Sequence, residues 1–230
     1  MAEVEKPINC PTITVLICTL NEEDSLPYVL PAIPDWVDEI LLVDGHSTDN
    51  TVAVAKQLCP RIKVLVQPGK GKGDALKMGI NEAKGEIIVT LDADGATDPG
   101  EMMNFIEPLM DGYDFAKGSR FLNSTPVMPL HRKFGNWVLT TTSNILFNTK
   151  YTDICSGYNA FRKEAIKKVH LVSDGFNMEQ EMNVKIKKAR LRVIEVACQD
   201  NGRRGGVSKT RAVKQGLIDL FTIIRERFRA

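Results

Sequence analysis

Two carboxylates one residue apart close an apolar run of strand length. Asp92 and Asp94 follow residues 87–91, which are rich in isoleucine, valine and leucine. Two like charges this close repel each other unless a cation joins them, and hard oxygen ligands suit Mg²⁺ or Mn²⁺, which also bind substrate phosphates. We therefore predict a metal site at Asp92 and Asp94. The competing interpretation is an Asx-type turn with a helix cap. A calcium loop is excluded because Ala96 and Thr97 stand where a ligand and a glycine are needed.

A loop of three glycines and two lysines, residues 69–73, precedes a predicted helix. Glycine lets a backbone approach a phosphate closely and lysine neutralises its charge, so the loop indicates phosphate binding. A flexible, solvated loop is the alternative. The P-loop pattern is absent, and no Gly-x-Gly-x-x-Gly follows the first apolar run, which disfavours a nicotinamide-binding protein.

Polar residues also follow the first two apolar runs. Thr19, Asn21 and Glu22 follow one run, and Asp44 ends the other. Asp44 is placed to accept hydrogen bonds from a ribose or a base, or else from a tight turn at Ser47 or Thr48. Ligands of open α/β sheets bind beyond the carboxyl ends of the strands, so all these clusters are predicted to share one rim. We find no Ser-His-Asp or Cys-His order that indicates a covalent nucleophile.

The elements that position these residues alternate between strands and helices, which calls for an α/β fold: a Rossmann-like, mostly parallel central sheet flanked by helices on both faces. Strands are predicted at residues 13–18, 39–43, 63–66, 86–91, 114–116, 158–161 and 192–198. Helices are predicted at residues 25–33, 49–58, 74–83, 99–109, 132–147, 163–169, 178–189 and 210–229.

Length and composition suit a single globular domain. The 230 residues carry a formal net charge of +1, which gives no reason to expect a nucleic-acid partner. The five cysteines are odd in number and lack Cys-x-x-Cys spacing, so free thiols and a cytoplasmic protein are expected. No run of about 18 apolar residues predicts a membrane span. Within one domain (1–230) we expect a nucleotide-sugar-binding half (12–118), an acceptor-binding half (119–209) and a C-terminal amphipathic helix (210–230).

That last helix carries one apolar stripe, at Val213, Leu217, Leu220, Ile224 and Phe228. Basic residues surround the stripe, and such a helix can lie in the interface of an anionic membrane. We hypothesise peripheral contact with the cytoplasmic membrane face. Docking of the stripe on the domain, or a homo-oligomer interface, are the alternatives.

The motifs resemble a known family. Residues 18–23, 43–51, 71–76 and 91–94 are similar to the motifs of inverting family 2 glycosyltransferases with the GT-A fold. In the second half, residues 118–121, 153–158, 161–164 and 203–209 resemble those of dolichol- or polyprenyl-phosphate sugar synthases. The resemblance runs from about Thr12 to Lys209.

The resemblance implies a role for individual positions. The residues it assigns to the nucleotide sugar are Thr19, Asn21, Glu22, Asp44, Lys72, Asp92, Ala93 and Asp94. Asp92 and Asp94 would hold the metal with the donor diphosphate. The residues it assigns to the acceptor phosphate are Arg120, Arg132, Arg203, Ser208 and Lys209. Gly95 follows the metal motif where many relatives have a bulky residue, so two protein ligands are expected.

Together these features predict a metal-dependent hexosyltransferase that moves a sugar from a UDP- or GDP-linked donor to a polyprenyl phosphate. A phosphate monoester is largely a dianion at neutral pH and needs no strong general base. A second interpretation is a family 2 glycosyltransferase acting on a hydroxyl of a soluble glycan or metabolite, which would need a catalytic base such as Asp153 or Glu179. A nucleotidyltransferase or a non-catalytic nucleotide-binding protein is a third.

Overall fold

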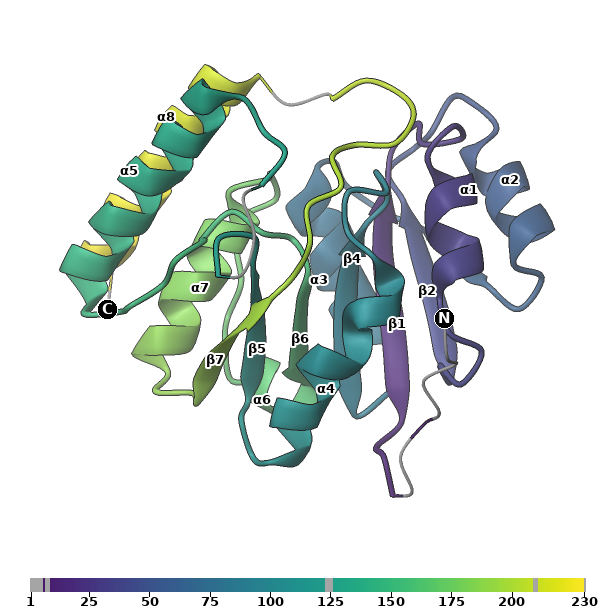
Figure 1. The fold of residues 1–230 in the computed structure, drawn as a ribbon, viewed down its shortest axis with the longest axis horizontal. Coiled ribbons are helices and arrows are strands. Elements are labelled where there is room, and N and C mark those ends of the chain that lie inside the picture. Colours follow the sequence, from purple (N-terminus) through teal and green to yellow (C-terminus); the bar gives the residue numbers. More distant parts are fainter. Residues whose placement is uncertain (1–5, 7–8, 123–125, 209–210, 230) are drawn as a thin grey trace.

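The protein is described by a computed structural model that covers residues 6, 9–122, 126–208 and 211–229. Seven strands form one sheet in the order β3-β2-β1-β4-β6-β5-β7, and only β6 runs antiparallel to its neighbours (Figure 1). The predicted α/β, mostly parallel GT-A-like sheet is therefore confirmed. The strands are β1 (Ile13–Thr19), β2 (Glu39–Asp44), β3 (Lys63–Val66), β4 (Ile87–Asp92), β5 (Phe115–Ser119), β6 (Asn159–Arg162) and β7 (Val193–Ala197).

Helices cover both faces of the sheet because its central strands are apolar on both sides. In β1, Ile13, Val15 and Ile17 face one core, while Leu16 faces the other. Helices α1, α2 and α4 cover the first core, and α3 and α7 cover the second. The helices are α1 (Leu26–Val29), α2 (Thr51–Leu58), α3 (Lys72–Glu82), α4 (Met102–Met110), α5 (Leu130–Phe147), α6 (Lys163–Ile166), α7 (Met178–Lys188) and α8 (Ala212–Phe228), with 3₁₀ turns at η1 (Leu30–Ala32) and η2 (Pro99–Glu101).

Helices α5 and α8 pack side by side at one end of the sheet (Figure 1). A small third core joins them through Leu139, Ile154 and Ile223. Most of the apolar stripe predicted for α8 is exposed, so the alternative in which the stripe docks on the domain is wrong. The helix docks instead through a different face, which includes Asp219, Thr222, Ile223 and Glu226. In the part of the chain that the structure describes, no helix is long and apolar enough to cross a bilayer.

Candidate active site

The predicted polar clusters meet at the carboxyl ends of three adjacent parallel strands. Thr19 ends β1 opposite Asp44 of β2, and Cys18 lies opposite Asp92 of β4. The chain leaves β1 for β2 on one side and returns as β4 on the other. This change of direction opens the crevice in which doubly wound sheets bind their ligands.

The β1–β2 side of this crevice contains two buried polar atoms without a hydrogen-bond partner in the described part of the chain. They are Oγ1 of Thr19 and Oδ1 of Asp44. The other carboxylate oxygen of Asp44 accepts a hydrogen bond from the backbone N of Ser47 (3.0 Å), so the turn interpretation also holds. A buried polar atom left unpaired costs about 1–3 kcal/mol. Hydroxyl and N–H groups of a nucleoside are suitable partners, so this pair of residues fits the predicted nucleotide site.

The loops after β1 and β2 are joined into one unit. Asn21 has a φ of 49°, and its Oδ1 accepts a hydrogen bond from the backbone N of Thr48 at 2.7 Å. Its own N–H donates to Ser47 Oγ (2.8 Å), while the Glu22 N–H donates to Thr51 Oγ1 (2.7 Å). Asn21 thus shapes the rim of the crevice through its backbone and side chain together.

Lys72 lies between two carboxylates from distant parts of the chain. Its Nζ is 2.5 Å from Oδ1 of Asp92 and 2.5 Å from Oε1 of Glu179. Desolvation opposes ionisation of Asp92, but the Lys72 ammonium, with help from Arg120 and Arg203, outweighs it and lowers the pKa of Asp92. Packing of α7 against α3 brings Glu179 here, so as a base it would have to act while bound to Lys72.

The glycines at the start of α3 have a packing role that the sequence did not reveal. A Cβ at Gly71 or Gly73 would lie 2.4 Å from a backbone oxygen of Asp174 or Ser173. The N–H of Gly73 donates to the Asp174 carbonyl at 2.7 Å, and that of Asp74 does so at 3.2 Å. These two donors are therefore already used, and close packing is a second reason for glycine at positions 71 and 73; phosphate binding by this loop stays a prediction. Lys72 is the group of this loop that reaches the site.

Asp94 lies beside an arginine from the last loop before α8. Its Oδ2 is 3.6 Å from Nη1 of Arg203, and the Arg203 guanidinium also contacts the Glu22 carboxylate. Oδ1 of Asp94 accepts a hydrogen bond from the Ala96 N–H (3.0 Å), which is the predicted Asx-type turn. Burial, followed by the charge of Asp92, raises the pKa of Asp94. The loop that carries Arg203 thus lies against the carboxylate pair.

The carboxylate pair is chemically suited to a divalent cation. Asp92 and Asp94 are hard oxygen ligands whose mutual repulsion a cation would relieve. Among the described residues, no group of three or more His, Cys, Asp or Glu side chains could hold a metal ion. Two carboxylates fit a site that leaves the remaining positions to water and a diphosphate, as Mg²⁺ sites commonly do.

Gly157 lies directly against Asp92, although its motif implied no role for it. A Cβ at this position would lie 2.4 Å from Oδ2 of Asp92. Glycine is needed here because the loop before β6 passes directly against the carboxylate. The only signal available in the sequence was the place of Gly157 inside the motif at residues 153–158.

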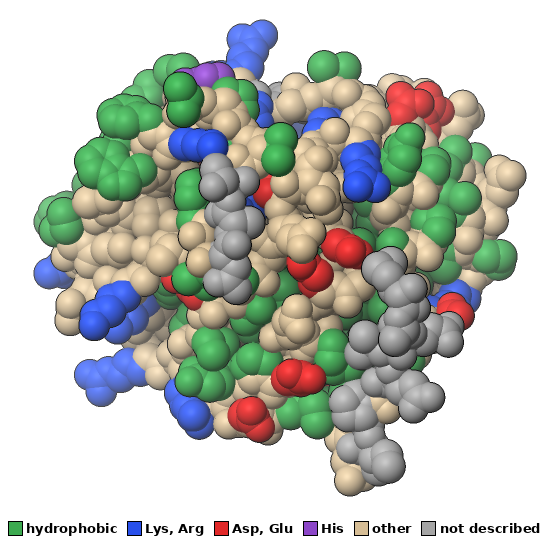
Figure 2. Space-filling model, in the orientation of Figure 1, with side chains coloured by type: hydrophobic (Ala, Val, Ile, Leu, Met, Phe, Trp, Pro, Cys, Tyr) green, Lys and Arg blue, Asp and Glu red, His purple; other side chains and the backbone are tan. Residues whose placement is uncertain are grey.

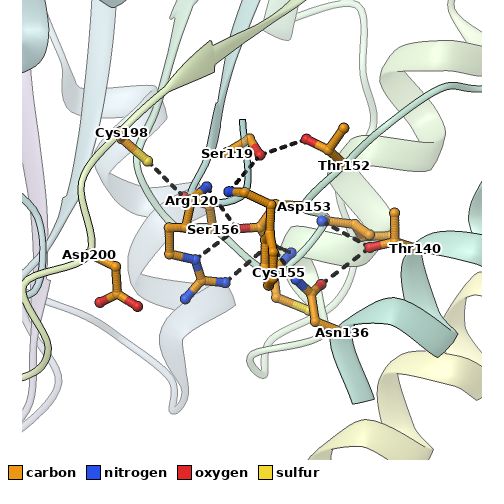
Figure 3. A network of polar contacts seen from close by, with 12 residues as sticks. Ser119, Arg120, Asn136, Thr140, Thr152, Asp153, Cys155, Ser156, Cys198 and Asp200 are labelled. Atoms are coloured by element: carbon orange, nitrogen blue, oxygen red, sulfur yellow. Dashed lines mark hydrogen bonds and ion pairs between the residues drawn. The ribbon is translucent and has the colours of Figure 1, made fainter. Parts of the chain in front are cut away.

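Arg120 and Asp153 form the centre of a buried polar network (Figure 3). Nε of Arg120 lies 2.7 Å from Oδ2 of Asp153, and Nη2 lies 3.1 Å from Oδ1. Asn136 Nδ2 and the Cys155 N–H also donate to Oδ1, at 2.9 and 3.0 Å. Burial alone would raise the pKa of the Asp153 carboxyl, but Arg120 overcomes burial and lowers it. The proposal of Asp153 as a general base is therefore corrected, since a carboxylate that is fully enclosed and ion-paired is a poor proton acceptor.

The other predicted acceptor residues lie at the start of α5 and in the loop before α8. Arg132 is exposed on α5, and its Nη2 donates to Ser208 Oγ at 3.4 Å. Lys209 lies outside the described residues. A cavity of about 290 Å³ lies beside the Arg120–Asp153 network, between α5 and the loops at Phe121 and Tyr151. The structure thus brings Arg203 to the carboxylate pair, and Arg120 close enough to influence Asp92, while Arg132 remains at the rim.

Comparisons with a family model and with related sequences identify the same family. The family described as glycosyl transferase family 2 matches residues 14–170. The chain is 32% identical to the glycosyltransferase AglJ of Haloferax volcanii over 80% of its own length and 61% of that protein, so it spans about three fifths of AglJ. It is 29% identical to an undecaprenyl-phosphate mannosyltransferase of Micrococcus luteus, with 86% of each chain covered.

The fold has a close counterpart among solved structures. Glucosyl-3-phosphoglycerate synthase from Mycobacterium tuberculosis, solved with Mn²⁺, UDP-glucose and phosphoglyceric acid, superposes with a TM-score of 0.74 at 19% identity. The match covers 94% of this chain and 80% of the mycobacterial chain, which establishes a common GT-A fold. With a family match over most of its length and a crevice formed by the family's motifs, this chain is a glycosyltransferase and belongs to glycosyl transferase family 2.

Proposed function

We propose that the protein transfers a sugar from a nucleotide-sugar donor to a polyprenyl phosphate, with Mg²⁺ or Mn²⁺ as cofactor. The observation that carries the proposal is the approach of Arg203 to Asp94 and Glu22, together with the effect of Arg120 and Arg203 on Asp92. Residues proposed for the acceptor phosphate thus lie next to those proposed for the donor diphosphate. The similarity to an enzyme named undecaprenyl-phosphate mannosyltransferase supports the same acceptor class.

On the donor side, Asp92 and Asp94 would hold the cation, which would supply Lewis-acid stabilisation of the leaving diphosphate. Thr19 and Asp44 would hold the nucleoside through their unpaired oxygens. Lys72, already beside Asp92, would lie within reach of the diphosphate and stabilise its developing negative charge.

On the acceptor side, arginine can bind a phosphate through two parallel hydrogen bonds. An acceptor phosphate oxygen forms the new bond to the anomeric carbon. The bond from that carbon to the donor diphosphate breaks, and its electron pair leaves with the nucleoside diphosphate. A phosphate dianion carries no proton that must be removed, so no base is needed. This agrees with the positions of Asp92, Asp94, Asp153 and Glu179, each of which lies beside a lysine or an arginine.

The second candidate is transfer to a hydroxyl of a small anionic metabolite. A structural neighbour was solved with phosphoglyceric acid, and the same arginines would suit such an acceptor. This reaction requires a base, and Glu179 is the remaining candidate because Asp153 is enclosed by the Arg120 network.

The deciding experiment is a transfer assay with radiolabelled UDP- and GDP-sugars. The protein with Mn²⁺ is offered a short-chain polyprenyl phosphate in detergent, the corresponding polyprenol, or phosphoglycerate. We expect labelled product with the polyprenyl phosphate alone, and a raised acceptor KM with little change in donor binding for Arg132→Ala. Transfer to phosphoglycerate and not to the lipid would establish the second candidate. Transfer to neither would overturn both.

A further inference from the structure

Helices α5 and α8 have their polar sides turned inward. Six of the eight side chains that they bury are polar: Asn136, Thr140, Ser143, Asp219, Thr222 and Glu226. Over the same two helices, ten large apolar side chains are exposed: Leu130, Phe134, Trp137, Ile145, Val213, Leu217, Ile218, Phe221, Ile224 and Phe228. Trp137 is 62% exposed and Phe228 is 85% exposed. A helix packed on a water-soluble protein normally shows the opposite pattern.

Specific contacts maintain this inverted arrangement. Asp219 accepts a hydrogen bond from Gln215 (2.8 Å), and Thr222 accepts one from Asn177 of the segment before α7 (3.0 Å). Glu226, with no exposed surface on its side chain, lies 3.9 Å from the ammonium of Lys185 of α7, and its backbone carbonyl accepts a hydrogen bond from Lys188 at 3.1 Å. Because buried polar groups of this kind are costly when unpaired, the contacts with Asn177 and Lys185 favour the orientation in which this side of α8 turns inward. The apolar side is left facing out, where Figure 2 shows hydrophobic side chains gathered over the outer side of α5.

The charges of this surface are one-sided. Both carboxylates of α8 are buried, and α5 contains none. The exposed charged side chains of the two helices are all basic: Arg132, Lys214 and Arg227. A two-fold contact between two copies would place this surface against itself, so its cations would meet cations without a carboxylate to pair them. An anionic, apolar layer satisfies both features at once.

The surface also adjoins the proposed acceptor site. Arg132, near the start of α5, contacts Ser208 of the loop that carries Arg203 to Asp94. On its inner side, α5 places Asn136 against Asp153, the partner of Arg120. A bilayer in contact with α5 and α8 would therefore present a lipid phosphate at the level of these arginines.

We propose that the outer faces of α5 and α8 form one membrane-docking surface, which rests the protein on an anionic bilayer with its acceptor arginines at the headgroup layer. The proposal rests on the proposed function insofar as a lipid acceptor explains why a bilayer should lie there. It extends the expectation from sequence, which concerned the last helix alone, to a two-helix surface that includes Trp137.

The test is co-sedimentation of the full chain with vesicles of phosphatidylcholine alone or mixed with phosphatidylglycerol, at low and high salt. We expect binding to the anionic vesicles at low salt and weaker binding at high salt. Leu217→Gln combined with Phe221→Gln should weaken binding about tenfold or more, since each removes an apolar side chain from the interface. Lys214→Ser should weaken it about fivefold, as expected from about 1 kcal/mol for each basic residue near an anionic surface. Leu58→Gln, an exposed apolar position on α2, is the matched control and should bind normally.

A spectroscopic readout does not depend on sedimentation. Trp137 fluorescence should shift to the blue on anionic vesicles and be quenched by lipids with brominated acyl chains, and both signals should disappear in Trp137→Phe. No vesicle binding, binding unchanged by the α8 variants, or a dimer in light scattering that those variants dissociate would each overturn the membrane surface. Transfer to short-chain polyprenyl phosphate in detergent separates the two proposals. If transfer persists without vesicle binding, only the docking surface is wrong. If vesicles bind without transfer to any phosphate, only the proposed acceptor is wrong.

Discussion

The ammonium group of Lys72 lies 2.5 Å from Oδ1 of Asp92, the carboxylate we propose as a metal ligand, and 2.5 Å from Oε1 of Glu179. A lysine and a divalent cation would share the same carboxylate. Because both are positive, they compete for Asp92 until a diphosphate brings negative charge to balance them. This relationship makes metal binding and nucleotide binding interdependent in ways that can be measured.

Replacing Lys72 by methionine should raise the affinity for the metal ion and lower the rate of sugar transfer. Removal of the ammonium frees Oδ1 of Asp92, so the affinity for Mn²⁺ alone, measured by calorimetry, should rise. Loss of the positive charge from the proposed diphosphate site should lower transfer about a hundredfold. Lys77→Met on the outer side of α3 is the control. Weaker Mn²⁺ binding in Lys72→Met would contradict the competition.

Asp92→Asn and Asp94→Asn should each lower transfer about a hundredfold or more, because a metal supplies several kcal/mol of charge stabilisation to the transition state. The thermal unfolding temperature should not fall in Asp94→Asn, since burial and Asp92 raise the pKa of Asp94, whereas Asp92→Asn also loses the ion pair with Lys72 and should unfold at a somewhat lower temperature. An excess of EDTA should silence the wild type, and Mn²⁺ should restore it. Full activity in the chelator would show that no divalent metal is required.

Gly157→Ala should damage the site without unfolding the protein. Its Cβ would lie 2.4 Å from Oδ2 of Asp92, so the carboxylate must rotate away from its present position. Transfer and Mn²⁺ affinity should both fall, while circular dichroism remains that of the wild type. Gly216→Ala is the matched control, because a Cβ there meets nothing within 4 Å, and a helical alanine should add about 0.5–1 kcal/mol of stability. Unchanged metal binding in Gly157→Ala would argue against Asp92 as a ligand.

Asp153→Asn should reduce stability in a pH-dependent way. The pKa of Asp153 is lowered in the folded protein, so its contribution is present above the unfolded pKa of about 3.9 and is lost as pH falls through the folded value. Breaking a buried ion pair costs about 3–5 kcal/mol. In urea unfolding, the difference from the wild type should be largest at neutral pH and shrink below about pH 4. A difference that does not vary with pH would mean that packing, and not charge, holds this network.

Asp219→Asn should have the opposite effect and raise the free energy of unfolding. Burial, aided by the charge of Glu179, raises the pKa of Asp219 to about 6, against about 3.9 in an unfolded chain. The folded protein therefore favours the protonated form, and the stability this gives is lost as pH rises through 6. Above pH 7, the free energy of unfolding of the neutral variant should exceed that of the wild type by up to about 2–3 kcal/mol. Below pH 4 the two free energies should be equal. Asp35→Asn, on the exposed surface, should show no such gain.

Local patterns in the sequence were enough to predict every strand, because a buried parallel strand is a short apolar run with polar residues at its ends. They failed where polarity interrupts a strand. β5 continues through Lys117 to Ser119, past its predicted end at Ala116, because neighbouring strands pair with it there. The insertion of antiparallel β6 between β4 and β5 likewise depends on which strands meet, and periodicity carries no information about partners.

The candidate site, too, was predicted only in part from the sequence. The sequence by itself placed Asp44, Asp92 and Asp94 on one rim, since each follows the end of a strand and parallel strands end on the same side. Only the tertiary structure decided which groups face them: Lys72 with Glu179, Arg203 with Glu22 and Asp94, and Arg120 with Asp153. These are contacts between residues far apart in the chain, and they depend on how helices pack on the sheet.

The outward apolar face of α8 is the clearest case of tertiary control. Its amphipathic stripe was visible in the sequence, but the usual rule would turn that stripe toward the core. The fold turns Thr222 and Glu226 inward instead, because Asn177, just before α7, and Lys185 of α7 contact them there. Which side of an amphipathic helix is buried depends on the partners that the rest of the fold brings to it, and those partners are not encoded in the helix itself.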